Sequence, residues 1–128
     1  MKRVTGIGGI FFKAKSPEKL RDWYQQHLGI EVEDYGGHTF KWRERDAPEQ
    51  PGSTVWSVFP ADTSYFGTNN LPFMVNYRVE NLDAVLAALK AESVQVDEHI
   101  HEQEFGRFGW ITDPEGNRIE LWEPAKGQ

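Results

Sequence analysis

Apolar and polar residues alternate in several short runs along the first half of the chain, and one longer run has the period of a helix. Residues 6–14 (GIGGIFFKA) read as a β-strand with glycines where another group approaches the backbone closely. Ser16 and Pro17 are typical of a helix start and Gly29 of its end, with apolar residues on one face between them. Three further strands are predicted, at residues 30–35, 38–44 and 53–59.

The second half repeats this order of elements. Residues 72–79 read as a strand, Asn81 as a helix N-cap, and residues 82–92 as a helix with an apolar face. The turn DPEGN, at residues 113–117, is typical of a tight connection between two strands. Three strands are predicted here as well, at residues 94–101, 106–112 and 117–123.

The two halves align with one constant offset, which indicates an internal duplication. An offset of 65 residues lays Phe11 on Asn76 and Gly9 on Met74. A chain of 128 residues is long enough for one domain with its own core. We therefore predict a single α+β domain over residues 1–128, made of two βαβββ modules at about 4–60 and 72–124.

Composition and charge narrow the classes of function. The chain carries 14 Lys and Arg against 20 Asp and Glu, and no basic stripe, so we expect no nucleic-acid partner. No apolar run is long enough to cross a bilayer, so no membrane partner is expected either. The absence of cysteine excludes thiol chemistry and fits the cytoplasm. Five Trp and eight Phe in a hydrophilic chain indicate an aromatic core or a ring-lined pocket.

The segment between the halves has two interpretations. Residues 60–72 (PADTSYFGTNNLP) are rich in turn-forming residues, which favours a solvated connector. The segment also contains Tyr65 and Phe66, which favours a loop that covers a pocket. The sequence leaves both open.

Two motifs carry a resemblance to a known family. WYQQHLGI closes the first predicted helix and DPEGNRIELWEP ends the second module. Together with the tandem βαβββ order, they resemble the vicinal oxygen chelate superfamily, which includes glyoxalase I and bleomycin-resistance proteins. The resemblance implies a curved mixed sheet around a cleft, a small-molecule ligand and a homodimer, commonly one that exchanges modules.

In metal-dependent members of that family, each module's first strand supplies a ligand and the strand after the D-P-x-G-N turn supplies another. Glu120 matches the last position, whereas spacing puts the other two on Gly9 and Met74. Glycine has no side chain and a thioether is too soft for the metals concerned. We therefore expect no metal site and no cofactor. His38, His99 and His101 remain possible members of an unorthodox site, although the neighbours of the last two are typical of an exposed strand.

Glu120 is the candidate catalytic residue, because strand alternation turns it toward the cleft. A buried carboxylate is costly unless it is paired, hydrated or protonated, and Lys13 and Arg78 are the candidate ion partners. A structural ion pair would explain it without any function. The candidate ligand-binding residues are Phe11, Lys13, Trp42, Trp56, Met74, Asn76, Arg78, Arg107, Trp110 and Trp122.

Three functions remain. The first is a metal-free cleft that binds a small aromatic or amphipathic molecule, as in the bleomycin-resistance branch. The second is a metal-dependent lyase or isomerase of the glyoxalase I type, for which a divalent metal would be needed. The third is a metal-free enzyme with Glu120 as general base. The first is favoured, and whether the protein is an enzyme is left open.

Overall fold

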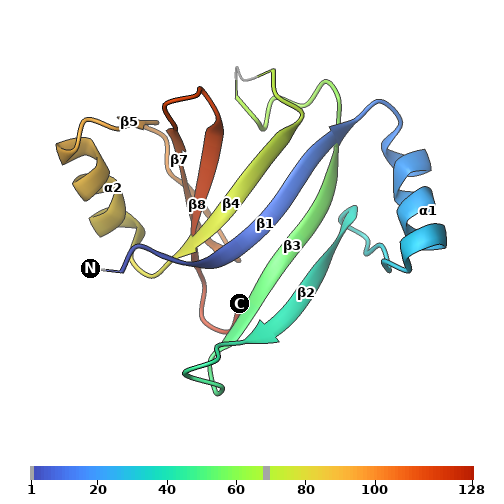
Figure 1. Cartoon of the computed structure of the whole chain (residues 1–128), viewed down its shortest axis with the longest axis horizontal. Coiled ribbons are helices and arrows are strands. Elements are labelled where there is room, and N and C mark those ends of the chain that lie inside the picture. The colour runs from blue at the N-terminus through green and yellow to red at the C-terminus, as the bar shows by residue number, and fades with distance from the viewer. Residues whose placement is uncertain (1, 68–69) are drawn as a thin grey trace.

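The computed structural model describes residues 2–67 and 70–128. The described chain forms one continuous mixed sheet with two helices, which confirms the predicted α+β class (Figure 1).

The first half contains three strands and a helix, namely β1 (Val4–Ala14), α1 (Pro17–Leu28), β2 (Gly37–Arg43) and β3 (Pro51–Pro60). Helix α1 begins with Pro17 directly after the N-cap residue Ser16, although the serine side chain makes no capping hydrogen bond. It ends at Gly29, whose φ of 67° lies in the left-handed region that glycine adopts without strain. These boundaries match the sequence prediction.

The second half contains β4 (Phe73–Val79), α2 (Leu82–Ala91), β5 (Gln95–Val96), β6 (His101–Gln103), β7 (Gly106–Thr112) and β8 (Arg118–Pro124). The side chain of Asn81 caps α2 by accepting a hydrogen bond of 3.0 Å from the Ala84 amide. Asp113 organises the β7–β8 turn, because its Oδ1 accepts from the amides of Glu115 and Asn117.

The two modules meet through their first strands. Strands β1 and β4 pair antiparallel in the middle of the sheet, with Gly9 opposite Asn76 and Phe11 opposite Met74. On either side the pattern repeats, since β1 pairs parallel with β3 and β4 pairs parallel with β8. The last strand of each module therefore lies next to its own first strand. The strand order across the sheet is β2-β3-β1-β4-β8-β7-β5, and β6 pairs with β7.

Two predicted strands differ in the structure. Residues 30–35 form no strand, because side chains satisfy part of this backbone: Gln25 Oε1 accepts from the Val32 amide and the His38 ring contacts the Glu31 carbonyl. Residues 94–101 do not form one strand either, and only the short β5 and β6 pair with β7 there. Alternation alone did not reveal that these backbone groups have other partners.

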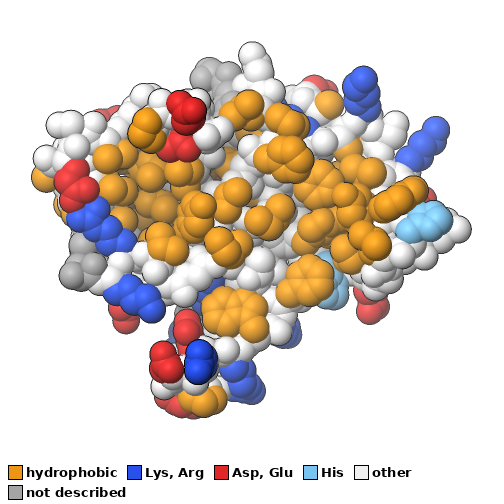
Figure 2. Space-filling view, in the orientation of Figure 1, with side chains coloured by type: hydrophobic (Ala, Val, Ile, Leu, Met, Phe, Trp, Pro, Cys, Tyr) orange, Lys and Arg blue, Asp and Glu red, His pale blue; other side chains and the backbone are white. Residues whose placement is uncertain are grey.

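Both helices pack on one face of the sheet. Helix α2 buries Leu82, Val85 and Leu86 against Val79 and Leu121. Helix α1 lies less deeply, with Tyr24 against Phe12 and Trp56 and no fully buried residue. Between the helices the sheet face stays open, and Figure 2 shows apolar side chains spread across it. The large apolar side chains that remain exposed include Ile7, Ile10 and Phe73.

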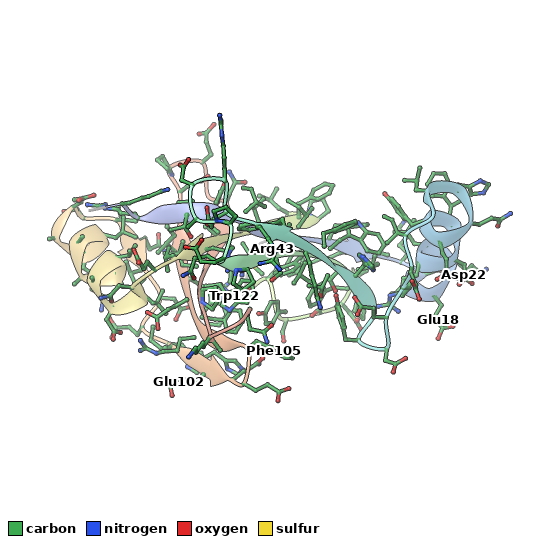
Figure 3. All side chains as sticks on the ribbon, turned by 90° about the horizontal axis from the view of Figure 1, so that it is seen from below. Glu18, Asp22, Arg43, Glu102, Phe105 and Trp122 are labelled. Carbon is green, nitrogen blue, oxygen red and sulfur yellow. The ribbon has the colours of Figure 1, made fainter. Side chains whose placement is uncertain are left out.

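The opposite face is concave and holds a second apolar cluster, of Phe11, Phe66, Met74 and Trp110. Seen from below, Trp122 and Phe105 lie together where β7 and β8 curve away from the rest of the sheet (Figure 3). This curvature leaves room for a cavity. In residues 2–67 and 70–128, no helix combines the length and apolar character needed to cross a membrane.

Candidate functional site

Glu120 lies at the centre of the concave face. On β8 it stands opposite Asn76 of β4 on one side and Trp110 of β7 on the other. The residue is fully buried, at 0% exposed. Strand alternation predicts this direction correctly, since the neighbouring Leu121 packs under α2 on the other face.

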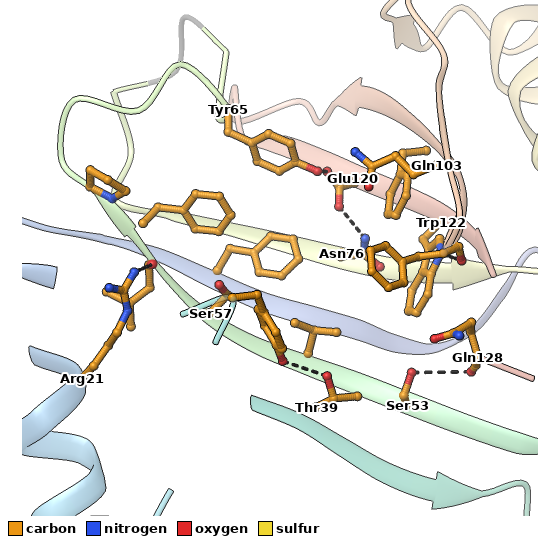
Figure 4. Close-up of a pocket in the computed structure, with 18 residues that line it drawn as sticks. Arg21, Thr39, Ser53, Ser57, Tyr65, Asn76, Gln103, Glu120, Trp122 and Gln128 are labelled. Atoms are coloured by element: carbon orange, nitrogen blue, oxygen red, sulfur yellow. Dashed lines mark hydrogen bonds between the residues drawn. The ribbon is translucent and has the colours of Figure 1, made fainter. Parts of the chain in front are cut away.

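Three neutral donors satisfy the Glu120 carboxyl group. The Tyr65 hydroxyl donates to Oε2 at 2.6 Å, the Trp110 indole N–H donates to the same oxygen at 2.9 Å, and the Asn76 amide donates to Oε1 at 2.6 Å. Two of these contacts are visible in Figure 4, where Tyr65 points at Glu120 and a dashed line joins Asn76 to it. Neutral donors reduce the cost of burying a carboxylate without supplying an opposite charge.

Burial dominates the electrostatics of this group. Desolvation raises the pKa of Glu120. The hydrogen bonds from Tyr65, Asn76 and Trp110 oppose that rise in part, and the positive charge of Arg118 adds a smaller opposing effect. Burial, together with the adjacent Glu120, also raises the pKa of Tyr65, so the phenol stays protonated and remains a donor. Glu120 therefore accepts a proton more readily than an exposed carboxylate does.

Neither predicted ion partner contacts Glu120. The Lys13 ammonium lies over the Phe66 ring, 5.2 Å from its centroid, and Arg78 stacks between Trp42 and Trp122. Among the described residues Glu120 makes no ion pair, so the expectation of a Lys13 or Arg78 partner was wrong. Asn76 on β4 and Tyr65 in the connector donate hydrogen bonds to the carboxylate, and neither cation does.

The residues that face Glu120 also differ from the two that the sequence spacing predicted. A Cβ added at Gly8 would lie 2.0 Å from Asn76 Oδ1, whereas one added at Gly9 would meet the Phe11 ring at 2.7 Å. Met74 packs in the apolar cluster with Phe66, and Asn76 touches the carboxylate. The positions facing Glu120 are thus Gly8 and Asn76, one and two residues from Gly9 and Met74. Irregularities in the β1–β4 pairing, between Ile7 and Gly9, account for the shift in β1.

These residues fit poorly with the metal that the resemblance implies. The groups around Glu120 are a phenol, a carboxamide and an indole N–H, all turned toward it as donors, and an indole nitrogen has no lone pair for a metal. No group of three or more His, Cys, Asp and Glu that could hold a metal ion occurs within the described ranges. His99 stacks on Trp110 and His101 contacts Gln103, while His38 lies near Glu31.

A cavity of about 450 Å³ opens beside Glu120. One wall is apolar and aromatic, and the other carries hydroxyl groups of β3. Such a volume, with few polar groups among rings, is typical of a small-molecule site. The aromatic side chains that line it are Phe11, Tyr35, Phe59, Tyr65, Phe105, Phe108 and Trp122.

The structure brings some candidate residues together and separates others. Phe11, Asn76, Glu120 and Trp122 line the cavity. Trp110 and Met74 lie behind its wall, in contact with lining residues. Arg78 lies between Trp122 and Trp42, and Lys13 lies over Phe66. The remaining two are elsewhere: Trp56 packs with Tyr24 on the helical face, and Arg107 pairs with Asp83 and Glu102 at the surface, so neither is kept as a ligand-binding candidate.

Several residues that line the cavity were not among the candidates predicted from the sequence. Ser53, Val55 and Ser57 alternate along β3 and all face the cavity, and the period of this strand was the available signal. Tyr65 answers the question left open for the connector: within its described part, Phe66 is fully buried and Tyr65 reaches Glu120, so the segment covers the pocket.

Comparisons with known proteins agree with this fold. A crystal structure of methylmalonyl-CoA epimerase from Mycobacterium tuberculosis is 22% identical, with 98% of this chain and 91% of that chain covered and a TM-score of 0.62. A Streptomyces coelicolor methylmalonyl-CoA epimerase in complex with 2-nitronate-propionyl-CoA is 17% identical over 95% and 99% of the chains, with a TM-score of 0.69. A Legionella pneumophila protein described as an NAD-dependent benzaldehyde dehydrogenase is 11% identical over 91% and 98%, with a TM-score of 0.60.

At these identities the likeness shows the fold alone. The comparison with curated proteins found no match. A family model described as Glyoxalase/Bleomycin resistance protein/Dioxygenase superfamily matches residues 6–121, and it confirms the resemblance inferred from the sequence motifs. The chain therefore belongs to the glyoxalase, bleomycin-resistance protein and dioxygenase superfamily.

Proposed function

We propose that the protein binds a small aromatic or amphipathic molecule in the cavity beside Glu120, without a metal ion. The observation that carries this proposal is a fully buried carboxyl group, held by three neutral donors, in the wall of a ring-lined cavity of about 450 Å³. The rings bind the flat part of the ligand, and the carboxyl group accepts a hydrogen bond from its polar or cationic group.

The arrangement of donors supports recognition by Glu120. A carboxylate has about four acceptor positions, and the side chains described above use three of them. One position remains for a donor of the ligand. Because Tyr65, Asn76 and Trp110 fix the carboxyl group in one orientation, it loses little conformational entropy when a ligand binds.

Tryptophan fluorescence tests the proposal directly, because Trp122 lines the cavity and Trp110 contacts Glu120. We expect para-phenylbenzylamine to quench emission with a micromolar dissociation constant. The matched hydrocarbon para-methylbiphenyl, which lacks the ammonium group, should bind at least tenfold more weakly. In Glu120→Gln this difference should shrink to less than threefold. Equal binding of both compounds to the wild type would refute the role of Glu120, and no binding of either would refute this ligand class.

Metal analysis supplies the second measurement. Protein purified without a His tag should contain less than about a tenth of an equivalent of any divalent transition metal. Dialysis against a chelator should leave the affinity for para-phenylbenzylamine unchanged. Loss of binding on dialysis, restored by one metal, would contradict the metal-free proposal.

Proton transfer by Glu120 is the second candidate, because burial raises the pKa of this carboxyl group toward the range of a general base. Solved structures of similar fold include methylmalonyl-CoA epimerases, and inversion of a stereocentre next to a thioester requires removal and return of a proton. If this chain acts likewise, methylmalonyl-CoA incubated with it in deuterium oxide should gain deuterium at that carbon, and Glu120→Gln should abolish the gain while retaining ligand affinity.

We also propose a homodimer in the cytoplasm. The open sheet face between α1 and α2 exposes Ile7, Ile10 and Phe73, at 41%, 38% and 59%, and adjacent exposed apolar side chains are typical of an interface between subunits. The cytoplasmic location is a prediction from the cysteine-free sequence.

A further inference from the structure

Arg21 on α1 is the one positively charged side chain that lines the cavity, within residues 2–67 and 70–128. Its Nε donates to the backbone oxygen of Gly36 at 2.9 Å, and its Nη2 donates to the backbone oxygen of Val58 at 2.7 Å. These hydrogen bonds join the helix to β3 and to the residue that precedes β2. They hold the guanidinium at one end of the cavity (Figure 4).

The backbone around Arg21 is shaped to receive this guanidinium. Gly36 has a φ of 95°, in the left-handed region, and a Cβ added there would lie 2.8 Å from Arg21 Nη2. Strand β2 begins at Gly37, opposite Ser57, so β3 continues past the start of β2. Arg21 contacts β3 where β2 no longer covers it, at Val58. The chain thus provides both the room and the acceptors that fix the side chain.

The guanidinium of Arg21 keeps donors that the protein does not use. A guanidinium has five N–H donors, and the two backbone oxygens take up two of them. Nη1 makes no hydrogen bond to the described part of the chain. No carboxylate of residues 2–67 and 70–128 lies at ion-pair distance from Arg21, although Glu18 and Asp22 are on the same helix. Backbone oxygens fix the group without neutralising it, so its charge remains available for an anion.

Glu120 is the one negatively charged side chain in the described lining, and aromatic side chains lie between it and Arg21 (Figure 4). Phe59, which follows Val58, stacks on Tyr65 with 5.3 Å between the ring centroids. Tyr65 in turn donates to Glu120. The two charged side chains form no ion pair with each other. A ligand with opposite charges at its two ends therefore finds a complementary charge at both.

We propose that Arg21 forms an anion subsite at the Val58 end of the cavity, and that the ligand carries a carboxylate there. This inference rests on the proposed function, and it specifies the ligand class: a flat apolar body with an ammonium or other donor group at one end and a carboxylate at the other. The rings of Phe59 and Tyr65 contact the body, and Nη1 of Arg21 donates to the carboxylate.

Matched pairs of probes test the subsite. Each probe carries an aminomethyl group at one end of an aromatic body and either a carboxylate or a primary carboxamide at the other. The body is a single phenyl ring in one pair and biphenyl in the second, so that two lengths are compared. By tryptophan fluorescence, we expect the wild type to bind the carboxylate at least tenfold more tightly than the carboxamide in one pair or both. Equal affinities in both pairs would overturn the subsite.

Arg21→Gln removes the charge and keeps an amide that can donate to one of the two backbone oxygens. In this variant the carboxylate and the carboxamide should bind within twofold of each other, because the affinity for the carboxylate falls while that for the carboxamide is unchanged. Lys19→Gln is the matched control, since it removes the same charge from an exposed position on α1 and should keep the tenfold preference. A preference that survives in folded Arg21→Gln, or that Lys19→Gln also abolishes, overturns the assignment to Arg21.

A crystal structure of the wild type with the preferred carboxylate decides the assignment if circular dichroism shows that Arg21→Gln does not fold. A carboxylate within hydrogen-bond distance of Arg21 supports the subsite, and a carboxylate bound elsewhere overturns it.

The outcomes separate the two proposals. Equal affinity of carboxylate and carboxamide, together with Glu120-dependent binding of para-phenylbenzylamine, overturns the subsite and leaves the proposed function standing. Absence of binding by every amine overturns both.

Discussion

Tyr65, in the segment between the two modules, donates a 2.6 Å hydrogen bond to Glu120 on the last strand. This contact joins the segment that covers the cavity to Glu120, which has the only fully buried carboxylate among the described residues. Tyr65→Phe removes the shorter of the two hydrogen bonds to Glu120 Oε2 and leaves this buried oxygen with the Trp110 indole as its donor. We expect the free energy of unfolding to fall by about 2 kcal/mol, measured by urea denaturation at neutral pH.

Tyr35→Phe is the matched control for that substitution. Tyr35 also lines the cavity, but its hydroxyl contacts Thr39 at an exposed position, where water can replace the lost partner. A loss below about 0.5 kcal/mol is expected there. If both variants lost the same free energy of unfolding, the Tyr65–Glu120 hydrogen bond would contribute no more to stability than an exposed contact does.

Glu120 should make stability depend on pH in an unusual direction. Because burial raises the pKa of Glu120 above 4.5 in the folded protein, the folded state takes up a proton at a higher pH than the unfolded chain does. Acidification from the raised value down to about 4.5 should therefore stabilise the wild type relative to Glu120→Gln. Thermal unfolding of both proteins across that window measures the difference.

Glu104→Gln provides the control, since it removes an exposed carboxylate and changes the net charge equally. Its unfolding temperature should follow that of the wild type through the window. Parallel curves for the wild type and Glu120→Gln would show that the buried carboxyl group titrates normally.

Gly8 should tolerate no side chain. An alanine there would bring Cβ to 2.0 Å from Asn76 Oδ1 and 3.0 Å from the Trp122 ring, so one of these groups must move. We expect Gly8→Ala to cost about 3 kcal/mol of stability and to weaken ligand binding, because Asn76 orients Glu120. Gly6→Ala, whose new Cβ has its closest neighbour at 3.4 Å, should cost less than about 1 kcal/mol. Similar losses in the two variants would argue against the crowding at Gly8.

The open sheet face should be an interface between two subunits. Phe73→Lys introduces a charge at a side chain that is 59% exposed in the single chain, and it should convert the proposed dimer to a monomer in sedimentation analysis. Gln95→Lys adds the same charge at an exposed position on β5, which lies at an end of the sheet, and should leave the dimer intact. A wild-type monomer at micromolar concentration would refute the dimer.

Periodicity predicted the main elements because their local signals agree with the packing. Pro17 and Gly29 bound the first helix, Asn81 caps the second, and Asp113 organises the last turn. The predicted strand at residues 30–35 does not form. Apolar residues alternate there, but side-chain contacts satisfy part of the backbone. Alternation describes which side chains are apolar, and it does not show where amide groups find their partners.

The place of Glu120 in the site was predictable from the sequence, and its hydrogen-bond partners were not. The turn motif and the alternation around Glu120 gave its direction and burial. Its partners depend on strand register, and an irregularity in β1 turns Gly8 instead of Gly9 toward Asn76. Tyr65 lies far from Glu120 in sequence, in a segment without periodicity, so no local pattern could assign the contact.

The donors to Glu120 and the hydroxyl-bearing wall of the cavity come from different parts of the chain. Every donor to Glu120 belongs to the second module or to the connector, whereas Ser53, Val55 and Ser57 on the opposite wall belong to the first. Substitutions along β3 can thus change the shape of the ligand cavity without disturbing Glu120. In a chain of two similarly ordered halves, one half is free to diversify its choice of molecule while the other preserves the group that recognises it.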